Sequence, residues 1–67
     1  MQLAEEERDI RRRSLNPMAL EGLPAKLRVA VLNYVEYGDR WVASRIAGLT
    51  VDEFTELLRK LGVAICP

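Results

Sequence analysis

Three glycines limit the fold more than any other feature, because they cut the second half of the chain into short segments. Gly38 is directly followed by Asp39, a residue type that caps helix N-termini. Gly48 stands two residues before Thr50, another N-cap type, and Gly62 follows the last apolar run as a C-terminal cap. We therefore predict three helices, at about residues 24–37, 40–47 and 50–61.

The last of these helices has the clearest pattern. Thr50 and Glu53 have the spacing of a capping box. One arc of this helix is apolar and consists of Val51, Phe54, Leu57, Leu58 and Leu61. The predicted buried residues of the middle helix are Val42, Ala43, Ile46 and Ala47. Trp41 and Arg45 fall outside that buried side.

The helix at 24–37 is apolar nearly all round. Its predicted core face consists of Leu27, Ala30, Val31 and Tyr34. Apolar residues also fall on the opposite face, and a chain of 67 residues buries too little surface to cover both faces. We therefore predict a homodimer in which Val29, Leu32 and Val35 face the second subunit.

The first part of the chain is dense in charge. Glu7 and Arg11 are four residues apart, in the order that supports a helix, so residues 1–15 are predicted to form a charged helix or arm. Asn-Pro disfavours a continuing helix, which makes residues 16–22 a linker. Residues 23–67 then form the core domain, and its end, at 63–65, is predicted to be a short strand.

Several function classes find no support in the composition. The chain has one cysteine, Cys66, and no histidine, so neither an intrachain disulfide nor a zinc site is expected. A nucleophile–base pair is also missing, which argues against an enzyme, and no cofactor motif is present. The longest apolar run is far too short to span a membrane. The acidic N-terminus lacks the core of a signal peptide, so we expect a cytoplasmic protein.

The two last helices and the turn between them have the layout of a helix-turn-helix. This motif needs a small residue where its helices cross and a glycine where the chain reverses, and Ser44 and Gly48 fit these positions. The predicted fold class is therefore all-α, with a small tri-helical helix-turn-helix core, the charged N-terminal helix or arm and the short C-terminal strand. The same pattern also fits an ordinary helical hairpin in a small bundle.

A resemblance to a known family bears on the choice between a DNA-binding helix-turn-helix and an ordinary helical hairpin. The stretch Tyr37–Phe54, which reads YGDRWVASRIAGLTVDEF, together with Leu57-Leu58 and Lys60–Val63, resembles a family of small prokaryotic, often archaeal, proteins. Many members of this family are predicted antitoxins of toxin–antitoxin pairs. The chain departs from the family pattern at Ser44, where a second alanine is usual, and the residue stays small. The resemblance implies DNA binding through the helix-turn-helix and a toxin as protein partner.

In this motif the last helix enters the major groove of DNA. The candidate DNA-binding residues are Arg40, Arg45, Thr50, Thr55, Arg59 and Lys60, with Arg11, Arg12 and Arg13 as an arm on the phosphate backbone. The net charge of zero argues against DNA binding, since DNA-binding domains usually carry a basic surplus. Asp52, Glu53 and Glu56 would approach the DNA, and the alternative is that they form a solvated helix face with its acids at the N-terminal end.

Two further alternatives stay open. The cluster Arg11–Arg13 could pair with the acids of residues 5–9 instead of with DNA. Trp41 is the candidate contact for a partner protein, because Trp and Arg are enriched at binding hot spots. The N-terminal segment of the same chain could cover Trp41 instead. The rival function is therefore a protein–protein adaptor of the same fold, which uses Trp41 and the acidic last helix and binds no DNA.

Overall fold

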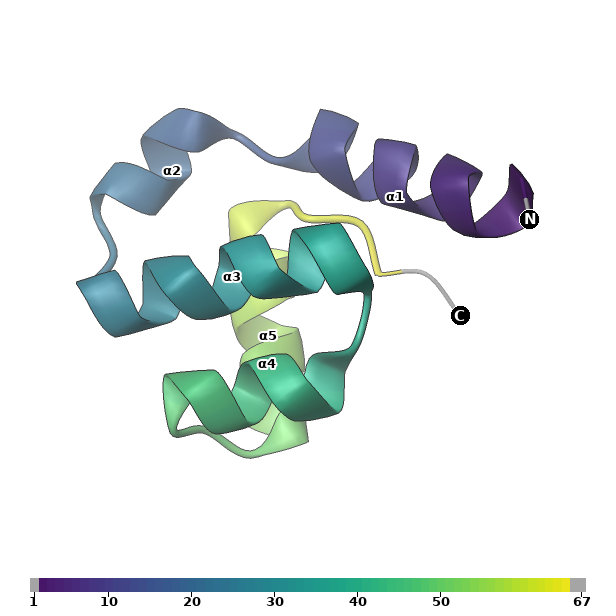
Figure 1. Cartoon of the computed structure of the whole chain (residues 1–67). Helices are drawn as coiled ribbons and strands as arrows, with labels where there is room; N and C mark the ends of the chain where they lie inside the picture. Colours follow the sequence, from purple (N-terminus) through teal and green to yellow (C-terminus); the bar gives the residue numbers. More distant parts are fainter. Residues whose placement is uncertain (1, 66–67) are drawn as a thin grey trace.

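The computed structural model describes residues 2–65 and contains five helices in that range (Figure 1). The helices are α1 (Gln2–Ser14), α2 (Pro17–Glu21), α3 (Ala25–Tyr37), α4 (Arg40–Ala47) and α5 (Val51–Leu61). The described residues include no strand. The predicted all-α class is thus confirmed, and the three core helices end within a residue of their predicted bounds.

The cap residues that divide the sequence also divide the structure. The Asp39 carboxylate accepts from the backbone N–H groups of Trp41 and Val42, which fixes the start of α4. Thr50 and Glu53 form the predicted capping box at the start of α5. Gly48 has φ of +70°, in the left-handed region where a side chain is strained, and this conformation turns the chain from α4 toward α5.

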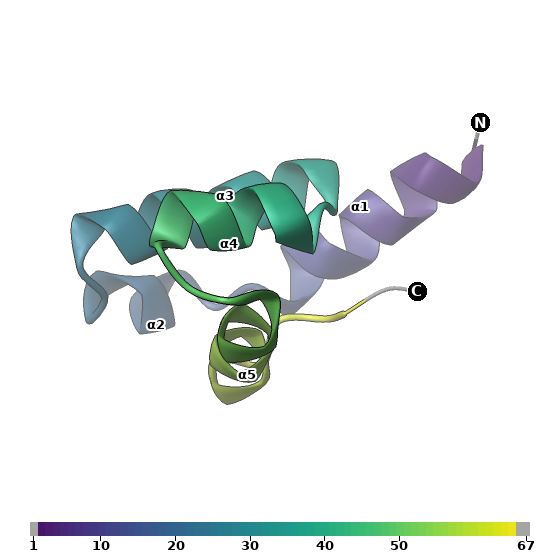
Figure 2. The same cartoon turned by 90° about the horizontal axis from the view of Figure 1, so that it is seen from below.

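The core lies where α3, α4 and α5 meet. α3 and α4 run antiparallel side by side, and α5 crosses beneath this layer (Figure 2). Tyr34 and Phe54 are fully or almost fully buried, and their rings meet edge to face with centroids 6.2 Å apart. Val31 and Leu58 fill the space around them. The α3–α5 contact therefore depends on a few large side chains.

The first helix is not a free arm, because α1 packs on α3. Arg11 is 6% exposed, and its Nε donates to the Val35 carbonyl at 2.9 Å. Val35 is itself only 5% exposed, so the prediction that it faces a second subunit is wrong. The reason is that α1 covers that side of α3. Val29 and Leu32 are exposed, as expected.

The predicted linker, 16–22, holds the short helix α2. The Asn16 side chain accepts from Met18 N–H, and Pro17 stands at the first position, where its missing N–H costs nothing. The same Asn-Pro pair that ends α1 therefore starts a new helix. Leu20 of α2 is buried against the core.

The predicted strand at 63–65 is wrong. Val63 is buried, while the backbone of Ala64 bonds to side chains instead of to a second strand. The Ala64 N–H donates to Ser14 Oγ at 2.8 Å, and its carbonyl accepts from the Tyr34 hydroxyl at 3.0 Å. The tail thus joins α1 to α3. Cys66 lies outside the described residues.

The structure adds two plain findings to the composition. Within residues 2–65, no helix has both the length and the apolar character that crossing a membrane requires. The same part of the chain brings together no group of three or more acidic, cysteine or histidine side chains that could hold a metal ion.

Candidate nucleic-acid interface

Two helices, α4 and α5, are joined by a short turn at residues 48–50. Ser44 is buried where α5 passes α4, and its carbonyl accepts from the Leu49 N–H at 3.0 Å. A larger side chain at position 44 would separate the two helices. Ser44 is thus a small buried residue of α4, and Gly48 has the left-handed backbone conformation of the turn.

The middle helix differs from the prediction on one side. Val42 was expected in the core, yet it is 47% exposed, while Ser44 is buried in its place. The buried arc of α4 is turned toward α5, because α5 crosses at Ser44. Ala43 and Ala47 are buried as predicted, and Ile46 is half-buried.

The outer face of α5 is uncovered and carries mixed charge. At 100° per residue, Asp52, Glu56 and Arg59 fall in one line along its centre. The Arg59 guanidinium donates to the Glu56 carboxylate at 2.7 Å, so these two charges offset each other. Glu53 is engaged in the capping box. Of the three carboxylates, Asp52 alone has no ion pair or hydrogen bond among the described residues.

Arg40 and Thr55 contact each other instead of facing outward separately. An Arg40 guanidinium nitrogen lies 3.1 Å from Thr55 Oγ1, which in turn donates to the Val51 carbonyl at 2.8 Å. Thr55 is buried, so the prediction that it contacts DNA is wrong. The cause is the approach of the α4 N-terminus to the middle of α5. Arg40 is half-buried and borders the outer face of α5.

Three further cations lie on α4 and α5 or against the turn between them. Arg45 and Lys60 are exposed and have no ion-pair partner within residues 2–65. Lys26 was not among the predicted DNA-binding residues, and its ammonium nitrogen lies only 3.0 Å from where a Cβ on Gly48 would stand. The sequence signal for Lys26 is weak, because 22 residues separate it from the turn and only the antiparallel packing of α3 and α4 brings it there.

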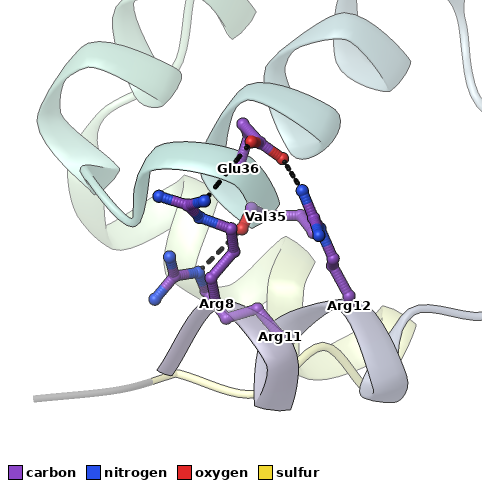
Figure 3. A network of polar contacts seen from close by, with 5 residues as sticks. All are labelled: Arg8, Arg11, Arg12, Val35 and Glu36. Carbon is purple, nitrogen blue, oxygen red and sulfur yellow. Dashed lines mark hydrogen bonds and ion pairs between the residues drawn. The ribbon is translucent and has the colours of Figure 1, made fainter. Parts of the chain in front are cut away.

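The arginine cluster of α1 is largely used within the chain (Figure 3). Arg11 is buried against α3, with its guanidinium 5.6 Å from the centre of the Tyr34 ring, so its predicted role in a DNA-binding arm is wrong. Arg12 donates to the Glu36 carboxylate at 2.7 Å and lowers the pKa of that carboxyl below its usual range. Arg8 approaches the same carboxylate at 3.9 Å.

These contacts also answer the alternative raised for the cluster. Arg12 forms its hydrogen bond and ion pair with Glu36 of α3, and Asp9 acts on it only as a weaker neighbouring charge. Arg13 is exposed and has no ion-pair partner among the described residues. It is the member of the cluster that is left for an external contact.

Trp41 borders a shallow groove between α4 and the start of α5. The groove is lined by Trp41, Ser44, Arg45, Leu49, Thr50, Val51 and Asp52. Trp41 is 72% exposed, so the N-terminal segment does not cover it. Thr50, predicted to contact DNA, lines this groove beside its capping contact to Glu53. The groove therefore combines an aromatic wall with one cation and one anion on its rim.

No known protein family, no curated protein and no solved structure matches this chain. The resemblance to small prokaryotic antitoxin-like proteins therefore stays a prediction that depends on the motif at residues 37–63.

Proposed function

We propose that this protein binds DNA as a dimer through the α4–α5 helix-turn-helix, as an antitoxin-like protein or transcriptional regulator. The observation that carries the proposal is the crossing of α4 and α5 at the buried Ser44. This crossing leaves α5 uncovered along its outer face, the orientation in which a recognition helix enters the major groove.

The proposed contacts divide into base readout and backbone contacts. Asp52 and Arg59 lie on the central line of α5, where a carboxylate can accept from a cytosine amino group and a guanidinium can donate to guanine. Arg40, Arg45 and Lys60 flank this line and would contact phosphates. Lys26 at the turn adds a fourth phosphate contact.

The balance of charge sets how strong this binding can be. The chain has ten basic and ten acidic side chains, so it lacks a general attraction to DNA. Two carboxylates of α5 are engaged locally, Glu53 in the cap and Glu56 with Arg59. Binding is therefore expected to depend on a few cations and to weaken steeply with added salt.

The Glu56–Arg59 pair gives a direct test. Glu56→Gln removes one negative charge from the central line and frees Arg59, so DNA affinity should rise roughly fivefold at low salt. The measurement is fluorescence anisotropy with a labelled duplex from upstream of the gene. Glu21→Gln is the matched control, because it removes the same charge from the exposed end of α2 and should leave affinity almost unchanged.

Two outcomes would contradict the proposal. Equal affinities for the wild type and Glu56→Gln would mean that α5 does not face the DNA. An equal rise in both variants would mean that only net charge matters, and that binding is not directed by the helix-turn-helix.

The groove beside Trp41 favours a second candidate, the protein–protein adaptor. An exposed tryptophan next to an arginine is typical of an interface hot spot. In this reading a partner protein, such as a toxin, would place an apolar side chain on Trp41 and a cation near Asp52. Salt separates the two functions, because an apolar contact of this kind should depend on salt much less than DNA binding does.

A further inference from the structure

The described side chains of α1 add almost nothing to the hydrophobic core. Residues 4–14 include two apolar side chains, those of Ala4 and Ile10, and both are exposed. None of the buried apolar side chains of the core belongs to this stretch. Leu15, directly after α1, is the first described side chain that packs against the core. Burial of apolar surface therefore contributes little to the docking of α1 on α3.

Polar contacts hold α1 on α3 instead. Glu36 of α3 is the common partner of two arginines of α1, Arg12 at 2.7 Å and Arg8 at 3.9 Å (Figure 3). These three side chains are 39–53% exposed, and ion pairs at such exposure add little stability and are screened by salt. The hydrogen bond from Arg11 to Val35 is buried, but burial also takes the Arg11 guanidinium out of water without an ion-pair partner among the described residues.

The contact between α1 and α3 is also incompletely packed. A hollow of about 230 Å³ lies between the two helices at the end of α3, and Arg8, Arg11, Glu36 and Tyr37 are among the residues that line it. Arg8 Nε is buried without a hydrogen-bond partner among the described residues, and an unsatisfied buried donor costs free energy in the docked state. The N-terminal end of α1 extends past the end of α3 (Figure 2). The docked position is therefore weakly stabilised.

We propose that α1 is a detachable clamp, whose residues 2–13 leave α3 and unfold while the core of α3, α4 and α5 stays folded. The released segment does not remain a stable helix, because α1 has 13 residues and isolated helices of about this length are marginal in water. Added salt favours the open form, since it screens the two ion pairs of Glu36. Opening uncovers Val35 and the last turn of α3.

The end of α1 that adjoins the rest of the chain stays in place when the clamp opens. Ser14 Oγ accepts from the Ala64 N–H at 2.8 Å, and Leu15 packs against the core. The segment that moves therefore ends just before Ser14. This device goes beyond the proposed function and does not depend on it, because none of the contacts that hold α1 belongs to α4 or α5.

The test is amide hydrogen exchange of the full chain, followed residue by residue by NMR without DNA. At low salt, the amides of residues 8–13 should exchange at least about 100-fold faster, relative to unfolded chain, than those around Leu58 in α5, because opening of the clamp needs less free energy than global unfolding. High salt should speed exchange in α1 by roughly fivefold and change exchange in α5 much less.

Glu36→Gln tests the anchor of the clamp. It removes both ion pairs but keeps the size of the side chain and a hydrogen-bond acceptor, so exchange in α1 should rise roughly fivefold and exchange in α5 should stay almost unchanged. Salt should then have little further effect on α1. Glu21→Gln is the matched control, because it removes the same charge from an exposed residue of α2 that has no ion pair among the described residues.

Three results would overturn the proposal. Exchange in α1 as slow as in α5 would mean that α1 opens only when the whole chain unfolds. Equal acceleration of α1 and α5 by Glu36→Gln would make α1 part of the cooperative core. Fast exchange in α1 that responds neither to salt nor to Glu36→Gln would mean that the ion pairs do not hold α1. Failure of the protein to bind DNA would remove the proposed function and leave the clamp standing.

Discussion

Phe54→Ala is expected to abolish the cooperative thermal unfolding of this protein. Phe54 is fully buried, and its ring meets that of Tyr34 edge to face across the α3–α5 contact. Truncation of a buried Phe to Ala costs about 4 kcal/mol. A core of this size supplies roughly 3–5 kcal/mol in total, so the variant would have almost no free energy of unfolding left. Circular dichroism at rising temperature measures the effect.

Trp41→Ala is the control for this loss. It truncates an even larger aromatic side chain, but one that is 72% exposed and outside the core. Its melting temperature should stay close to that of the wild type. If Phe54→Ala melted within a few degrees of Trp41→Ala, α5 would not depend on the Tyr34–Phe54 contact, and the packing described above would be incorrect.

Arg45→Glu with Lys60→Glu should abolish measurable DNA binding. Both cations are exposed and unpaired within the described residues, so reversing them breaks no internal contact. Each reversal removes a phosphate contact and adds a repelling charge. Affinity is expected to fall roughly 100-fold or more at moderate salt, and the salt dependence of binding should drop by about one unit of slope for each lost contact.

The single variants provide the control on net charge. Arg13→Glu changes the charge by the same amount as Arg45→Glu, but it lies on α1. Arg13→Glu should weaken binding much less than Arg45→Glu does. Equal losses would mean that net charge alone sets the affinity, and would contradict binding of DNA at α4 and α5.

The core helices could be predicted because their signals are local. Asp39 and the Thr50–Glu53 box act on backbone groups two or three residues away, and Gly48 needs its conformation for the turn itself. The apolar arc of α5 could also be predicted from the sequence of α5 alone, without reference to the neighbouring helices. These features were enough to predict α4, the turn at Gly48 and α5.

Most of the errors concern contacts between distant segments, and the helix α2 in the predicted linker is the exception. Arg11 and Val35 are 24 residues apart, and nothing in either local pattern shows that a charged helix would cover the side of α3 that looked free. The tail resembles a strand by its residue types, but Ser14 and Tyr34 supply its hydrogen bonds. Thr55 looked available on the helix surface until Arg40 of α4 covered it.

The exposure of a residue was predicted correctly where the pattern of its own helix decides it, and wrongly where a neighbouring helix decides it. Val29, Leu32 and Trp41 fall outside the buried arcs of their own helices, and they are exposed in the structure. Val42 was assigned to the core because the buried arc of α4 depends on where α5 crosses it. Where α5 crosses α4 depends on how the two helices pack, so the helical repeat of 3.6 residues alone cannot predict it.

The most direct test of the central claim is an electrophoretic shift with the purified full chain and duplex DNA from upstream of its gene, at low and at moderate salt. Our account predicts a shift that survives unrelated competitor DNA and weakens strongly as salt is raised. The absence of any shift at low salt would contradict it. The helix-turn-helix would then be a structural element, and the groove at Trp41 would become the leading site for a protein partner.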